Sequence, residues 1–81
     1  MKTTFLPSFV GDLPKPAVEA CLAHGITDKV LIGIWRIGKD DYLSKATNTK
    51  SGVVYANARG LSEKEARSDC LRALNYYLAD L

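Results

Sequence analysis

Apolar and polar positions follow strand-like patterns in three successive stretches of the chain, and each stretch predicts a β-strand. Residues 29–37, KVLIGIWRI, are rich in β-branched side chains and apolar on both alternating faces, which is typical of a well-buried strand. Residues 42–49 are more polar, and residues 52–59 carry small apolar side chains at every second position. The sequences GKDD and TKSG between these stretches have the composition of turns. We therefore expect an antiparallel meander of three strands.

Helical spacing of apolar residues predicts one helix before the meander in the sequence and one helix after it. Residues 14–25, PKPAVEACLAHG, indicate a short helix, with Asp12 as its N-terminal cap and Gly25 as its C-terminal stop. Near the C-terminus, Ser62 and Glu65 form a capping box at the start of a longer helix. The apolar stripe of that longer helix comprises Ala66, Cys70, Ala73, Leu74, Tyr77, Leu78 and Leu81.

These elements predict a single α+β domain over residues 1–81, in the order α-β-β-β-α. Residues 1–12 are expected to be extended and to pack on the body of the domain. Both helices should cover the sheet face that carries Val30, Ile32, Ile34, Val54, Ala56 and Ala58. The opposite face then carries Leu31, Trp35, Ile37, Val53 and Tyr55. Large apolar side chains gathered on a solvent face predict an interaction surface.

Composition places the chain among small globular proteins. Its 81 residues are 47% apolar and 25% charged, which allows one core but little room for an enclosed active site. Eleven Lys and Arg against nine Asp and Glu give a net charge of +2, with the signs interleaved rather than gathered into a basic run. Apolar runs are too short for a membrane span, and the N-terminus lacks the apolar core of a signal peptide, so we expect a cytoplasmic location.

Residues capable of catalysis or metal binding are few and scattered. Cys21 and Cys70 are isolated, and we expect two buried thiols, with a disulfide between them as the alternative in a secreted chain. Together with His24 they do not supply four zinc ligands at usable spacing. A Cys21–His24 nucleophile pair would lack an orienting group, and Asp40 and Asp41 are expected to be turn formers. We therefore expect no enzyme activity, no metal site and no cofactor.

The closing segment GLSEKEARSDCLRAL, residues 60–74, resembles the last helix of the double-stranded-RNA-binding domain, whose element order is also α-β-β-β-α. In that family, basic residues at the helix start hold phosphates across the major groove. The resemblance implies this role for Lys64 and Arg67, with Arg72 further along the helix. Glu63 replaces the first basic residue of the motif, and the loop GKDD lacks the Gly-Pro-x-His of the family. The same segment also resembles the strand-to-helix passage of HicB-type antitoxins, which lack the N-terminal helix.

Trp35 and Tyr55 are the candidate anchors of the expected interaction surface, with Arg36 and Arg59 as flanking contacts. Because Trp, Tyr and Arg dominate the energetics of interfaces, our preferred hypothesis is a small regulator that binds another protein, comparable to antitoxins or phage-encoded inhibitors. A homodimer would use the same patch.

Other uses of the Trp35 surface stay open at this point. With Lys45 close by, it would also suit a stacking platform for single-stranded nucleic acid. Phe5 and Phe9 would instead make a second small core if they folded back over Trp35. Binding of double-stranded RNA through the closing helix is a further alternative.

Overall fold

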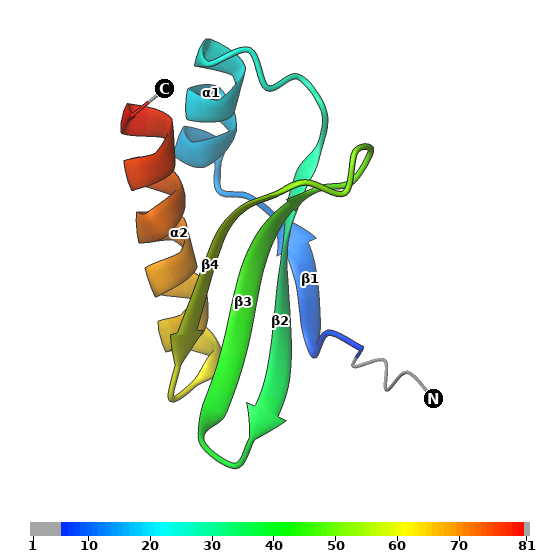
Figure 1. Cartoon of the computed structure of the whole chain (residues 1–81), viewed down its shortest axis with the longest axis vertical. Helices are drawn as coiled ribbons and strands as arrows, with labels where there is room; N and C mark the ends of the chain where they lie inside the picture. Colours follow the sequence, from blue (N-terminus) through cyan, green and yellow to red (C-terminus); the bar gives the residue numbers. More distant parts are fainter. Residues whose placement is uncertain (1–5, 81) are drawn as a thin grey trace.

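The computed structural model describes residues 6–80, which form one four-stranded antiparallel sheet and two helices (Figure 1). The strands lie side by side in chain order, β1-β2-β3-β4. The elements are, in sequence, β1 (Phe9–Asp12), α1 (Lys15–Ala23), β2 (Val30–Gly38), β3 (Asp41–Asn48), β4 (Val54–Gly60) and α2 (Glu63–Ala79). This arrangement confirms the α+β class and the pairing of a short N-terminal helix with a long C-terminal one.

The prediction of three strands is wrong, because part of the expected extended segment forms a fourth strand, β1, at one edge of the sheet. β1 runs antiparallel to β2, with Phe9 opposite Ile34 and Asp12 opposite Leu31. Its sequence, FVGD, contains Gly and Asp, which are depleted in strands. The conformation of β1 therefore depends on its ladder with β2. Ser8 extends this contact, because both its backbone N–H and its hydroxyl donate to the carbonyl oxygen of Ile34.

Both predicted turns of the meander are confirmed. Gly38 lies opposite Asp41, so Lys39 and Asp40 form the loop between β2 and β3. The turn between β3 and β4 contains Gly52 with a φ of 78°, a left-handed conformation that favours glycine.

Both helices cover one face of the sheet, and α2 packs mainly on β4 and β3 (Figure 1). Small side chains on these strands allow the helix to approach closely. Gly60 is the extreme case, since a Cβ atom there would lie 2.6 Å from the backbone nitrogen of Ala66. Ser62 is the N-cap of α2 and accepts a hydrogen bond from the backbone N–H of Glu65 at 3.1 Å, as predicted. The core between the layers includes Ile32, Ile34, Ala46, Ala56, Cys70, Leu74 and Leu78.

For the shorter helix, α1, the sequence predicted the C-terminal end correctly but not the N-terminal cap. Gly25 follows its C-terminus with a φ of 79°, which confirms the expected stop. The prediction that Asp12 caps its N-terminus is wrong, because Pro14 is the N-cap residue and no side chain caps it. Asp12 instead ends β1, and its carboxylate pairs with Lys29 at 3.1 Å. Within residues 6–80, neither helix has the length and apolar character needed to cross a membrane.

Candidate functional site

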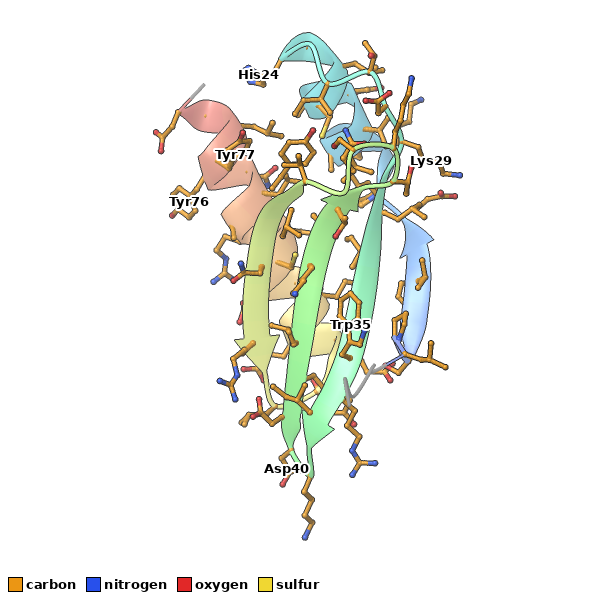
Figure 2. All side chains as sticks on the ribbon, turned by 45° about the vertical axis from the view of Figure 1, so that its right-hand side comes forward. His24, Lys29, Trp35, Asp40, Tyr76 and Tyr77 are labelled. Carbon is orange, nitrogen blue, oxygen red and sulfur yellow. The ribbon has the colours of Figure 1, made fainter. Side chains whose placement is uncertain are left out.

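The sheet face opposite the helices is the candidate functional site, and we call it the open face. Figure 2 shows it with Trp35 near the middle of β2 and the helices behind the sheet. Residues opposite one another on neighbouring strands point to the same side, so the strand register gives its membership. The open face consists of Val10, Asp12, Leu31, Gly33, Trp35, Asp41, Leu43, Lys45, Thr47, Val54, Asn57 and Arg59. The prediction that Val54 lies on the helix-covered face is wrong, because it pairs with Thr47 and is 41% exposed.

The Trp35 side chain is held flat on its own strand. A Cβ atom on Gly33 would lie 2.6 Å from the indole ring, so the absence of a side chain at Gly33 makes room for it. Gly33 pairs with Val10 on one side and with Lys45 on the other, so the ring lies between these two side chains. The Lys45 ammonium is 5.7 Å from the ring centroid, which is cation–π distance. An aromatic ring over a strand glycine restores the packing that the glycine lacks.

An apolar centre and a polar rim surround Trp35. Leu31 and Leu43 are half-buried beside it, and Val10 is 53% exposed. An apolar centre inside a polar border is typical of protein interfaces.

The carboxylates of the open face are already paired. Asp12 binds Lys29, and Asp41 binds the guanidinium of Arg59. Exposed ion pairs of this kind contribute little to stability, but the two side chains of each pair neutralise each other's charge. Among residues 6–80, Lys45 is therefore the charged group of the open face that has no opposite charge.

Tyr55 does not lie beside Trp35, so this part of the predicted site is wrong. The register of β3 and β4 shifts at this point, because Ala46 pairs with Ala56 whereas Thr47 pairs with Val54. Tyr55 is the extra residue of a β-bulge, which re-aims a side chain.

The ring of Tyr55 packs on the helix side of the sheet. Its centroid is 5.7 Å from that of Tyr77, and its hydroxyl accepts a hydrogen bond from the side-chain amide of Asn48 at 3.0 Å. Strict alternation along the sequence placed Tyr55 with Trp35, and no sequence signal marks the bulge that separates them.

The two predicted flanking arginines have different roles. Arg59 lies on the open face, as expected, but is engaged by Asp41. Arg36 lies at the end of β2 and donates hydrogen bonds to the carbonyl oxygens of Gly38 and Lys39 at 3.1 and 3.3 Å. Its guanidinium therefore holds the hairpin.

Phe9 does not cover Trp35. It pairs with Ile34 on the helix side of the sheet, and its ring lies over Gly11 of its own strand. The prediction that Phe9 builds a second core with Trp35 is wrong, and Phe5 lies outside the described residues.

The three basic residues implied by the RNA-binding resemblance all belong to α2. Lys64 is exposed, Arg67 is half-buried, and Arg72 is 3.6 Å from the carboxylate of Asp69. Carboxylates surround the start of this helix. Glu63 and Glu65 lie in its first turn, and Asp40, Asp41 and Glu65 line one surface hollow. This acidic surrounding disfavours a phosphate group.

The thiols of Cys21 and Cys70 are free and buried, as expected, and they do not form the alternative disulfide. Burial raises the pKa of both thiols, which disfavours the nucleophilic thiolate. His24 is exposed at the end of α1. Within residues 6–80, the acidic, histidine and cysteine side chains form no group of three or more that would hold a metal ion.

Comparison of the chain with protein-family models, with curated proteins and with solved structures gave no match. The function proposed below therefore rests on the geometry of the open face.

Proposed function

We propose that this chain is a small binding protein that recognises another protein through its open face, with Trp35 as the central anchor. The observation that carries the proposal is the position of the indole ring, which lies over Gly33 on the sheet face that the helices do not cover. Tryptophan is among the residues that most often dominate binding energy.

Pre-organisation of the ring supports this role. Because the indole packs between Val10 and Lys45, it loses little conformational freedom when a partner covers it. Binding surfaces that are ordered before contact lose less entropy on association.

Charge defines the chemistry of the partner. Lys45 offers a positive charge, while Asp12 and Asp41 are already neutralised. A partner surface with Asp or Glu next to an apolar side chain would complement this face. A second copy of the chain would instead bring another Lys45 and no unpaired open-face carboxylate from its described residues, so we propose a different protein as the partner.

The position of Tyr55 favours a protein over single-stranded nucleic acid. A stacking platform needs aromatic rings that receive successive bases. The second ring expected for such a platform packs against Tyr77 on the other side of the sheet. Within residues 6–80, the open face therefore carries one aromatic side chain, that of Trp35.

The proposal is tested with peptides selected from a random library displayed on phage, with the whole protein as bait. We expect selected peptides to combine Asp or Glu with an apolar residue. In calorimetric titrations, Trp35→Ala should weaken binding by about tenfold or more, because loss of a central anchor costs about 2 kcal/mol. Lys45→Glu should also weaken it, because the introduced carboxylate repels the acidic peptide.

Lys64→Glu is the matched control, since it makes the same charge change on α2, behind the sheet. It should leave the peptide affinity within twofold, roughly the change expected for a distant surface charge. Equal losses in Lys45→Glu and Lys64→Glu would show non-specific attraction and contradict the proposal. Full affinity in a folded Trp35→Ala variant would contradict it as well.

A further inference from the structure

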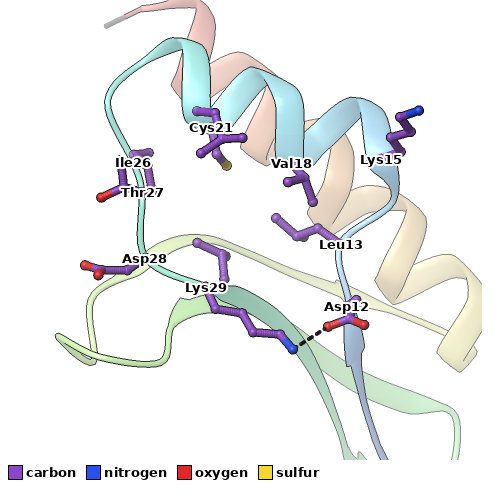
Figure 3. A pocket seen from close by; sticks show the side chains of 11 residues that line it. Asp12, Leu13, Lys15, Val18, Cys21, Ile26, Thr27, Asp28 and Lys29 are labelled. Atoms are coloured by element: carbon purple, nitrogen blue, oxygen red, sulfur yellow. Dashed lines mark ion pairs between the residues drawn. The ribbon is translucent and has the colours of Figure 1, made fainter.

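A pocket separate from the Trp35 site lies beneath α1 (Figure 3). It has a volume of about 460 Å³, within the range of small-molecule sites. Its walls are α1, the residues that connect β1 to α1, and the segment from Ile26 to Val30 that leads into β2. The pocket therefore depends on three segments that the fold brings together.

The interior of this pocket is aliphatic. On α1, Ala17 packs into the core, whereas Val18 and Leu22 face the pocket and stay 40% and 54% exposed. An aliphatic occupant would remove this surface from water, which is favourable. The apolar lining consists of Leu13, Val18, Cys21, Leu22, Ile26 and Val30.

Two of the four charged groups at the rim form an ion pair with each other. Lys29 pairs with Asp12 at 3.1 Å, shown by the dashed line in Figure 3. The carboxylate of Asp28 accepts a hydrogen bond from the side-chain amide of Asn48 at 3.3 Å. Lys15 forms no ion pair or hydrogen bond through its side chain with any residue that the structure describes.

The positions of the two charges without an ion pair to any described residue, Lys15 and Asp28, give the pocket a direction. Lys15 is the first residue of α1, where the positive end of the helix dipole adds to its charge. Asp28 lies on the opposite side of the pocket (Figure 3). A negative group is thus favoured at the Lys15 side and disfavoured at the Asp28 side.

We propose that this pocket binds a free aliphatic carboxylate of medium chain length. Its hydrocarbon chain lies between Val18, Leu22 and Ile26. In Figure 3 the Lys15 side chain points away from the pocket, and in the complex it turns in from the rim so that its ammonium meets the carboxylate. This site is on a different part of the molecule from Trp35 and does not depend on the proposed function of the open face.

The test is a titration of the isotope-labelled protein with decanoate below the concentration at which decanoate forms micelles, followed by amide chemical shifts. We expect saturable shifts at Val18, Leu22, Ile26 and Val30. Lys15→Gln should weaken binding by about twofold to fivefold, the range for one exposed charge contact. Lys39→Gln, which removes the same charge from the distant hairpin, should leave the affinity unchanged.

Two further titrations keep the result interpretable. Val18→Asp places a charge inside the pocket at a partly exposed position, so it should abolish binding while the protein stays folded. Decyltrimethylammonium carries the same chain with a positive head and should bind at least about threefold more weakly than decanoate. Any of four results would overturn the proposal: no saturable shifts at the pocket, binding only above micelle formation, equal affinities of Lys15→Gln and Lys39→Gln, or equal affinities for the two ligands.

Discussion

Replacement of Asn48 by alanine should remove the network that fixes one end of the sheet and the orientation of Tyr55. The Asn48 side chain is buried, with 3% of the residue exposed. Its amide nitrogen donates to the Tyr55 hydroxyl and to the Asp28 carboxylate, and its oxygen accepts from the backbone N–H groups of Lys50 and Ser51, which makes four hydrogen bonds.

The magnitude follows from the hydrogen bonds that Asn48→Ala would remove. A typical intramolecular hydrogen bond stabilises a protein by about 1 kcal/mol net. Some of the released partners reach water, so the four bonds together should contribute about 3 kcal/mol. For a domain of this size, that loss should lower Tm by roughly 12–24 °C.

Thermal and urea unfolding followed by circular dichroism measure this loss. Asn57→Ala is the matched control, because Asn57 is exposed on the open face and makes no side-chain hydrogen bond with the described residues. Its substitution should change the unfolding free energy by no more than about 0.5 kcal/mol. If Asn48→Ala costs no more than Asn57→Ala, the Asn48 network does not stabilise the fold.

Three other predictions separate the two faces of the sheet and the core. Tyr55→Phe removes one hydrogen bond, so it should lower the unfolding free energy by about 1 kcal/mol while the calorimetric affinity for a selected peptide stays unchanged; a loss of affinity at full stability would contradict this. Gly33→Ala should displace the Trp35 ring, shift its fluorescence emission to longer wavelength and weaken peptide binding, since the added Cβ would lie 2.6 Å from the ring; unchanged emission would show that the ring does not lie there. Burial raises the pKa of the Cys21 and Cys70 thiols, so their contribution to stability is complete below the ordinary thiol pKa of 9.0 and is lost as the pH rises above it. The urea midpoint should fall between pH 8 and 10 more in the wild type than in the double alanine variant, and equal falls would refute the assignment.

Local sequence signals were sufficient for α2 and for the strands of the meander. The cap of α2 depends on Ser62 and the residues directly after it, so sequence and structure agree there. Four residues of the predicted stripe are fully buried, namely Ala66, Cys70, Leu74 and Leu78. Strand β2 also lies within one residue of its predicted bounds, because its β-branched run is continuous.

Non-local features were missed, and each has a physical reason. β1 has a weak strand sequence, and pairing with β2 decides its conformation. The bulge at Tyr55 depends on the register between β3 and β4, which alternation within one strand does not report. The pocket under α1 requires three separate segments to meet, which no local sequence pattern reports. Trp35 alone of the two predicted aromatic anchors lies on the open face.

The role of the open face is tested most directly by chemical-shift mapping of the isotope-labelled protein with a selected acidic, apolar peptide. We predict that the largest changes occur at the Trp35 indole N–H and at the amides of Val10, Gly33, Leu43 and Lys45, with little change along α2. Changes centred on α2 or on the pocket beneath α1, with the Trp35 indole unaffected, would contradict the proposal that this face binds the partner.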